Sequence, residues 1–317
     1  MKEKKNDRPL QNPIINHSPY IDPDAARKYF YYVLERHEIY MRRKNGKEFP
    51  WTDNKILQEN SFTCNRRQDD RTSRWLIDHI SNNPDLSFED RVWRSMLFRL
   101  YNKIKTAELI HLDSPDFWDH IEEYADILDA QTDDVYTRAF KTVSLKYQYR
   151  DQFPDRNWRS LRLLGFSELH KSYNGKVPTE LLGTAQEALD WVRQMPGVGG
   201  FMGYQLVIDL TYIDEIPYSN NWFVIAGPGC KTGMDFFMPD RDGMTYEEAV
   251  LYVTMNFEML CRMFYDKDFD YSKIHKDLED ENCYSVSDIQ NTYCEYGKFR
   301  YLLEDRHKNK RAYKYNG

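Results

Sequence analysis

Hydrophobic residues recur at spacings of three and four along most of this chain, and this periodicity predicts a mainly helical protein. The most regular stretch follows Ser87. Its apolar face carries Val92, Trp93, Met96, Leu97, Leu100, Tyr101 and Ile104. The opposite face carries Arg91, Arg94, Arg99, Lys103 and Lys105. The alternation of period two that is typical of strands is rare along the chain.

The same pattern predicts the other helices and the limits of the folded domain. Helices are expected over 24–45, 116–128, 135–149, 158–168, 184–194, 201–212, 245–264 and 288–303. Asp24 is the expected cap of the first helix, and a capping box opens the one at Thr245. We predict a flexible lead-in over 1–22, a single two-lobed helical domain over 23–303, and a basic disordered tail over 304–317.

Composition narrows the class of protein. The formal net charge of −7 argues against binding nucleic acid by bulk charge, so any such surface must be a local patch. The 24 Tyr, 17 Phe and 7 Trp suit both core packing and base stacking. No apolar run approaches the ~20 residues of a membrane helix, and the five cysteines form no CxxC pair. We therefore expect a cytoplasmic protein with reduced thiols.

A sharp turn separates the helices predicted over 184–194 and 201–212. Two glycines flank Val198 there, and the first amides of the second helix have no acceptor within the helix. Such amides can bind an anion, of which a DNA phosphate is the most natural. We predict that Gly197, Val198, Gly199 and Gly200 contact the DNA backbone, with Val198 pointing inward. An ordinary helical corner is the alternative.

Charge is concentrated between residues 62 and 74. If this segment is helical, Arg67, Asp70, Arg71 and Arg74 share one face. Arginine forks suit phosphate or pyrophosphate oxygens, and Asp70 could orient them or accept a proton. A solvated helix face held by salt bridges is the alternative.

The sequence Ala-Gly-Pro-Gly-Cys-Lys-Thr-Gly at 226–233 predicts a glycine-rich loop. The spacing from Gly227 to Lys231 fails the P-loop pattern, which argues against a P-loop nucleotide triphosphatase. Two interpretations remain: a tight turn that presents backbone amides and Lys231 to an anion, or a plain connecting loop.

The last predicted helix has a polar face. Asp288, Asn291 and Glu295 share this face, and Lys298 follows one turn later. Such a cluster either builds a site or ties the helix to the core. Cys294 has no nearby His in the sequence, so a nucleophilic thiol has little support.

The turn and its flanking helices, over about 184–212, resemble the helix-hairpin-helix of the DNA glycosylase superfamily. The resemblance implies a glycosylase-like helical fold. That superfamily carries a Lys early in the second helix of its lyases and a catalytic Asp downstream of the hairpin. Phe201 stands at the Lys position, and Asn220 and Asn221 stand near the Asp position. We therefore expect the scaffold without the groups that cleave a base.

Four motifs in order, at 62–71, 191–210, 226–229 and 288–298, resemble the alpha-glutamyl/putrescinyl thymine pyrophosphorylase family. These proteins are also described as amino acid:DNA transferases, and the helical domain of 5-hydroxymethyluracil DNA kinases belongs to the same group. The resemblance spans about residues 29–303. It implies a bacteriophage enzyme in which an amino acid or a polyamine displaces pyrophosphate from 5-(pyrophosphoryloxymethyl)uracil in DNA.

The resemblance also gives the candidate residues roles. Arg67, Arg71, Gly229 and Lys231 would bind the departing pyrophosphate, while Asp70 or Glu295 would take a proton from the amine. The predicted catalytic residues are therefore Arg67, Asp70, Arg71 and Glu295. The base would be flipped out of the stack. Mg²⁺ would assist the pyrophosphate, although no dedicated carboxylate cage for a metal is visible.

The expected partners are double-stranded DNA with modified thymine, a small amine or amino-acid donor, and a hydroxymethyluracil DNA kinase, without a membrane. Two alternatives stay open. One is a helix-hairpin-helix DNA glycosylase with a relocated carboxylate. The other is a non-catalytic DNA-binding partner of such a kinase.

Overall fold

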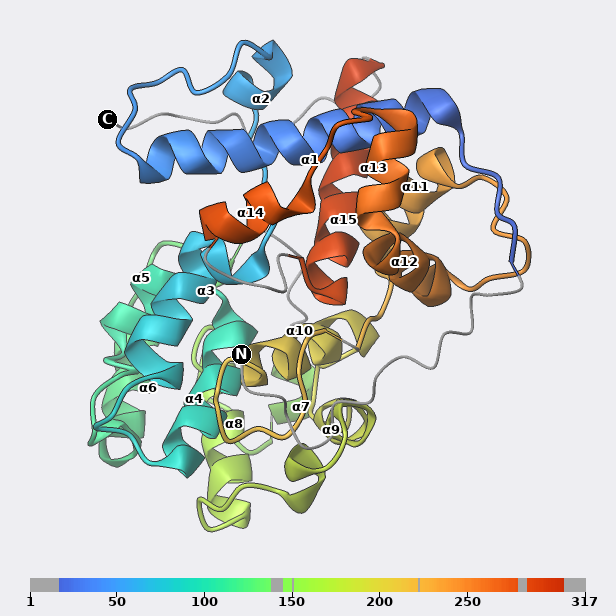
Figure 1. Ribbon diagram of the computed structural model, residues 1–317. Helices are drawn as coiled ribbons and strands as arrows, with labels where there is room; N and C mark the ends of the chain where they lie inside the picture. Colours follow the sequence, from blue (N-terminus) through green and yellow to red (C-terminus); the bar gives the residue numbers. More distant parts are fainter. Residues whose placement is uncertain (1–16, 138–144, 150, 222, 279–283, 305–317) are drawn as a thin grey trace. The chain divides into compact units, whose positions relative to one another are not determined.

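The computed structural model describes residues 17–137, 145–149, 151–221, 223–278 and 284–304 (Figure 1). These residues are mainly helical, which confirms the mainly helical part of the predicted fold class, and the glycosylase-like architecture stays a prediction. Among them no strand forms, and Tyr20 and Asp240 share an isolated antiparallel bridge. Within the same ranges, no helix combines the length and apolar character needed to cross a membrane. Most of the predicted lead-in and nearly all of the predicted tail lie outside the described residues.

The chain forms two compact units. Unit 1 contains the described residues of Arg8–Asp70 and Asn220–Gly317, and unit 2 contains those of Arg71–Ser219. The chain therefore leaves unit 1 after Asp70 and returns to it at Asn220. The prediction of a single catalytic domain over 23–303 stays a prediction.

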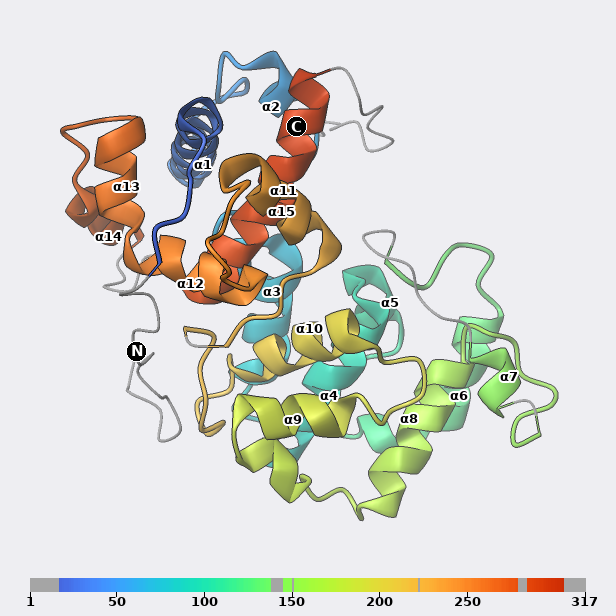
Figure 2. The same cartoon turned by 90° about the vertical axis from the view of Figure 1, so that its right-hand side faces the viewer.

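Unit 1 is built on α1 (Pro23–Lys44) and α15 (Val286–Leu303). Tyr29 of α1 stacks on Tyr293 of α15 with ring centroids 4.4 Å apart, so the core joins the two ends of the chain. Helix α1 packs against α11, α13 and α15; it crosses α13 and α15 in Figure 1 and is seen nearly end-on between them in Figure 2. The other elements of unit 1 are α2 (Lys55–Glu59), η1 (Arg67–Asp69), α11 (Pro228–Phe237), α12 (Tyr246–Met255), α13 (Phe257–Phe264) and α14 (Tyr271–Leu278).

The first helix begins slightly earlier than predicted. Asp22 is its N-cap and accepts a hydrogen bond from the Ala25 amide at 2.7 Å, so the prediction of Asp24 as the cap was wrong. Pro23 explains the difference, because proline suits the first helical position, where its missing N–H has no helical acceptor.

The glycine-rich segment 227–233 does not form the predicted loop. It opens α11, which crosses α15 very closely. A Cβ atom on Gly233 would lie 1.9 Å from the carbonyl oxygen of Tyr293. The absence of a side chain at Gly233 therefore lets the two helices pack closely. Local sequence patterns do not reveal such a tertiary contact.

The helix predicted over 245–264 is broken at Asn256 into α12 and α13, although its capping box forms as predicted. The break lets Phe257 enter the core, where it is 1% exposed and its ring centroid lies 5.3 Å from that of Phe30. Burial of this ring stabilises the interrupted geometry over a continuous helix.

Unit 2 is built around α4 (Phe88–Tyr101), which follows Ser87 as predicted and has Ser87 as its N-cap. Arg94 and Arg99 do not lie on a solvated face: they are 0% and 6% exposed. Arg99 pairs with Asp209 at 2.5 Å because α4 packs closely against α10 (Gly200–Leu210). The other elements are α3 (Arg71–Leu76), η2 (Ile77–Ser81), α5 (Ile104–Leu109), η3 (Phe117–His120), α6 (Ile121–Asp129), α7 (Lys146–Tyr149), α8 (Leu161–Ser172), η4 (Thr179–Leu182) and α9 (Ala185–Val192).

The helix predicted over 135–149 is not continuous. Residues 135–137 are not helical, and the Thr137 amide donates to the Tyr101 carbonyl at 2.9 Å, which ties this segment to the end of α4. Residues 138–144 lie outside the described ranges, and α7 follows them. The helix predicted from residue 158 begins later, as α8.

Candidate functional site

A polar face of α15 holds the segment 61–67 within unit 1. Asn291 donates from its side-chain nitrogen to the Cys64 carbonyl at 2.9 Å and to the Thr63 hydroxyl at 3.1 Å. Glu295 accepts from the Thr63 amide at 3.4 Å. Two motifs that lie far apart in the sequence are therefore in direct contact.

Lys298 completes this face. Its ammonium group donates to the Ser61 carbonyl, lies 3.7 Å from the Glu295 carboxylate, and lies 4.3 Å from the ring centroid of Phe62. The side chains of Glu295 and Lys298 are only 16% and 21% exposed. Glu295 and Lys298 therefore form a partly shielded pair of opposite charges beside the segment 61–67. Their spacing in the sequence predicted that they lie on the same side of the helix.

Asp288 fixes the other end of the segment. Its carboxylate accepts from the Arg67 amide at 2.8 Å and forms a capping box with Ser285 at the start of α15. Burial raises the pKa of Asp288, against the lowering effect of these hydrogen bonds. This contact sets the point at which the Arg67 side chain leaves the backbone.

The segment is also held from the α1 side by residues that the sequence did not single out. Arg36 donates to the carbonyls of Phe62 and Thr63, at 3.2 Å each, and Asn65 donates to the Val33 carbonyl at 2.7 Å. Arg36 and Asn65 are both buried, at 8% exposure. An arginine on an amphipathic helix gives no local signal of this role.

The stretch from Arg67 to Arg74 is not one helix, so the prediction of a shared helical face was wrong. The turn η1 ends at Asp70, whose backbone is extended at φ −68 and ψ 140, and α3 then begins at Arg71. The chain passes from unit 1 to unit 2 at this point, which requires an extended link. Arg67 and Asp70 therefore belong to unit 1, whereas Arg71 lines a cavity of unit 2.

Two thiols lie near the Glu295 face. Burial raises the pKa of Cys64 and of Cys294 to about 11 each. Both are therefore protonated near neutral pH, and a thiol is a weak nucleophile. This agrees with the expectation that a nucleophilic role of Cys294 has little support.

Gly229 and Lys231 lie in the first turn of α11 rather than in a loop. A Cβ atom on Gly229 would lie 2.4 Å from the sulfur of Cys294, so this glycine permits close packing against α15. Lys231 is exposed, with its ammonium nitrogen 5.2 Å from the ring centroid of Tyr246. The predicted role of both residues in pyrophosphate binding stays a prediction.

The turn between α9 and α10 has the local form that the sequence predicts. Gly197 adopts a left-handed backbone at φ 74, and Val198 is 7% exposed and points inward. A Cβ atom on Gly199 or Gly200 would meet nothing within 4 Å. The first backward bond of α10 runs from the Gly203 amide to the Gly199 carbonyl at 2.8 Å, so the preceding amides have no acceptor within the helix. The DNA contact assigned to this turn stays a prediction.

Family comparison gives this arrangement a context. Residues 24–308 match the family described as the 5-hmdU DNA kinase, helical domain. The chain belongs to this family. A 5-hmdU DNA kinase of Bacillus phage SP10 is 24% identical over 253 residues, which make up 74% of this chain and 40% of that kinase. No solved structure matches the chain.

Membership of the 5-hmdU DNA kinase helical-domain family confirms the relation to these kinases that the sequence motifs indicate. The matched region runs from α1 to beyond α15, so the family includes both units. The chain spans less than half the length of the phage kinase. Across the described ranges, no group of three or more His, Cys, Asp or Glu residues is arranged to hold a metal ion.

Proposed function

We propose that this protein is an amine:DNA transferase that hypermodifies thymine in bacteriophage DNA. The substrate would be 5-(pyrophosphoryloxymethyl)uracil. A C–N bond forms at the exocyclic CH₂ group, the C–O bond to pyrophosphate breaks, pyrophosphate leaves, and the amine loses one proton. The name of the phage relative, 5-hmdU DNA kinase, supports a substrate with the same base chemistry.

One observation carries the proposal: α15 gathers Arg67, Glu295 and Lys298 around a single segment of unit 1. Displacement of pyrophosphate needs cations for the negative charge that grows on the leaving group, and a planar guanidinium binds two such oxygens at once. Arg67 is the proposed main contact. Lys231, which belongs to the same unit, is a further pyrophosphate ligand in this proposal.

The attacking amine must lose a proton, and a carboxylate is the natural acceptor. Glu295 and Asp70 are the candidates. Glu295 is the better supported of the two because its carboxylate is largely shielded, is fixed on a long helix, and lies 3.7 Å from the Lys298 ammonium. Asp70 lies at the extended end of η1, where the chain passes from unit 1 to unit 2.

In the same proposal the hairpin around Gly199 is a glycosylase-like clamp that holds the DNA backbone, and the modified base is flipped out to react. Base removal is not expected, because Phe201 and Asn220 occupy the positions of the glycosylase Lys and Asp. Mg²⁺ would neutralise pyrophosphate oxygens if it takes part. A hydroxymethyluracil DNA kinase would supply the chemistry that precedes this step.

The decisive experiment uses duplex DNA that carries 5-(pyrophosphoryloxymethyl)uracil, a pool of amino acids and polyamines, and mass spectrometry of the digested nucleosides. We expect a nucleoside in which the amine replaces pyrophosphate, together with free pyrophosphate. Glu295→Gln should lower the rate by about 100-fold or more, since loss of a general base has this scale of effect. Glu258→Gln, which removes a carboxylate from a surface pair with Arg262, is the matched control.

The other outcomes of this assay separate the alternatives. Release of a free base with formation of an abasic site would identify a glycosylase. Unmodified DNA that is nevertheless bound tightly, with every amine and with Mg²⁺ present, would identify a non-catalytic DNA-binding module. Either result overturns the transferase.

A further inference from the structure

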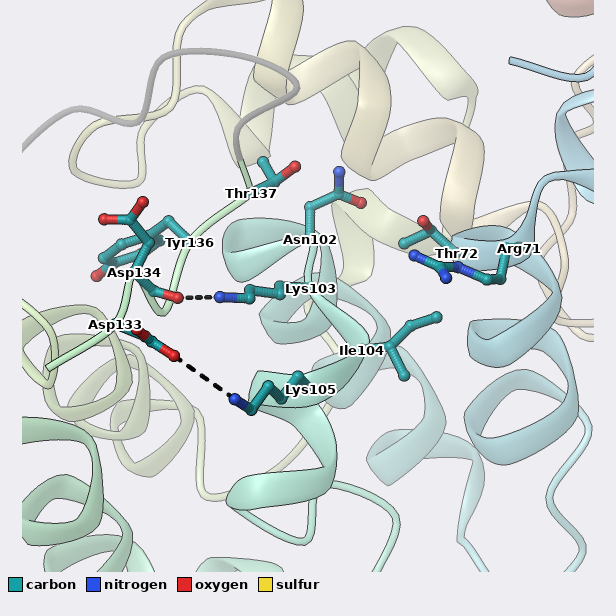
Figure 3. Close-up of a pocket in the computed structure, with 10 residues that line it drawn as sticks. All are labelled: Arg71, Thr72, Asn102, Lys103, Ile104, Lys105, Asp133, Asp134, Tyr136 and Thr137. Carbon is teal, nitrogen blue, oxygen red and sulfur yellow. Dashed lines mark hydrogen bonds and ion pairs between the residues drawn. The ribbon is translucent and has the colours of Figure 1, made fainter. Parts of the chain in front are cut away.

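A cavity of about 450 Å³ lies within unit 2, beside the first residues of α3 and the turn from α4 to α5. Figure 3 shows Arg71 and Thr72 on one side, and Lys103 and Lys105 reaching toward residues 133–134 on the other. Its lining residues are Arg71, Thr72, Asn102, Lys103, Ile104, Lys105, Asp133, Asp134, Tyr136 and Thr137. The volume falls within the range of sites that bind nucleotide-sized ligands.

The lining carries one net positive charge, because three cationic side chains face two carboxylates. Lys105 lies 3.6 Å from Asp133, but both side chains are more than two-thirds exposed, so this pair is weak. Lys103 donates to the backbone carbonyl of Asp134, which leaves its charge without neutralisation. Arg71 is exposed and forms no ion pair with a described residue.

Buried contacts fix one wall of the cavity. Asn102 adopts a left-handed backbone at φ 48, and its side-chain oxygen accepts from Arg99 at 2.9 Å. Arg99 is held in turn by the buried carboxylate of Asp209 at 2.5 Å. The oxygen of Asn102 is therefore engaged, while its amide nitrogen remains a donor. Tyr136, 6% exposed, stacks on Tyr101 with ring centroids 4.9 Å apart.

We propose that this cavity binds a phosphate group through Arg71, Lys103 and the Asn102 amide, with Lys105 at its edge. Two cations without carboxylate partners and a fixed neutral donor suit phosphate oxygens, and the guanidinium provides the bidentate contact. The phosphate belongs either to the DNA backbone or to the pyrophosphate group. The pyrophosphate source rests on the proposed function. Phosphate binding by the cavity can be measured on its own, because the binding assay requires no transferase activity.

The test compares Arg71→Gln and Lys103→Gln, singly and combined, with the native protein. Binding of a mixed-sequence DNA duplex is followed by fluorescence anisotropy over a range of salt, and binding of inorganic pyrophosphate by calorimetry. Lys176→Gln removes an exposed lysine of the same unit, 3.5 Å from Glu89, and serves as the charge-matched control. Arg71 and Lys176 are exposed and Lys103 is partly exposed, so thermal unfolding of each variant is measured to confirm that it is folded.

For a DNA-backbone phosphate, the double variant should bind duplex about tenfold or more weakly, with a salt slope reduced by about two contacts. For the pyrophosphate group, calorimetry should show the loss instead, with duplex affinity retained. Asn102→Asp keeps a residue that tolerates the left-handed backbone and adds a negative charge, so it should weaken the same ligand. If all four cavity variants bind both probes like Lys176→Gln, the proposal is wrong.

These outcomes are distinguishable from failure of the transferase itself. Loss of phosphate binding in a protein that transfers no amine would support the cavity and overturn the proposed function. If the cavity variants bind both probes as the native protein does, and the native protein transfers the amine, the proposed function is supported and the phosphate site in the cavity is overturned.

Discussion

The Asp288 carboxylate links the Arg67 backbone to the first turn of α15, and it does so from a buried position. Burial disfavours the ionised form and raises the pKa, while hydrogen bonds from Arg67 and Ser285 oppose the shift. Desolvation is the larger effect. The residue that orients the candidate site therefore makes the stability of unit 1 depend on pH.

The direction of that dependence follows from linkage. Because the pKa of Asp288 is higher in the folded protein than in the unfolded chain, stability falls as the pH rises through the folded value. Asp288→Asn cannot ionise, so the stability of the native protein relative to this variant should decrease as the pH rises above about 4, the ordinary pKa of an aspartate. Urea denaturation across this range measures the difference, with the exposed Asp190→Asn as control. A difference that is constant with pH would contradict the expectation.

At the scale of elements, the crossing of α11 and α15 depends on glycine. A methyl group on Gly233 would meet the Tyr293 carbonyl at 1.9 Å, and a backbone atom in a packed helix cannot move aside cheaply. Gly233→Ala should therefore lower the free energy of unfolding by about 3 kcal/mol. Gly199→Ala is the matched control because a Cβ atom there meets nothing within 4 Å. Urea denaturation of both variants is the measurement, and equal stabilities would refute the packing role.

Local sequence patterns predicted where the helices form more accurately than they predicted which residues the helices contact. A helix follows Ser87 and a capping box forms at Thr245, as predicted, and the polar residues of α15 share one face as their spacing predicts. The segment 227–233 was misread because low helix propensity was outweighed by tertiary packing. The segment 67–74 was misread because periodicity carries no information on where a chain passes between two units.

At the scale of the whole molecule, the chain path explains why the candidate site was only partly predictable. Unit 1 is assembled from two segments separated by the whole of unit 2, so Thr63 meets Glu295 across 232 positions. The sequence identified Arg67, Asp70 and Glu295 by residue type. It did not reveal Arg36 behind the segment, nor the cavity formed by Arg71, Asn102 and Lys103, because long-range contacts place these residues.

The chain path also predicts that the two units differ in their ability to fold as isolated fragments. Unit 2 is one continuous stretch, Arg71–Ser219, with its own buried core around α4 and the buried Arg99–Asp209 pair. We expect this fragment to unfold cooperatively on heating, as a compact domain of its size does. The fragment 220–304 lacks α1 and hence the Tyr29 ring that stacks on Tyr293, so it should show no such transition.

Circular dichroism of the two fragments measures the difference, and fluorescence anisotropy with duplex DNA adds a functional readout. If the hairpin and the cavity act as proposed, fragment 71–219 should retain salt-dependent DNA binding, whereas fragment 220–304 should lose it. A non-cooperative melt of fragment 71–219 would show that unit 2 depends on unit 1 for its fold. Cooperative folding without DNA affinity would instead locate the DNA contacts in unit 1, and the DNA contacts proposed for Gly199 and Lys103 would have to be withdrawn.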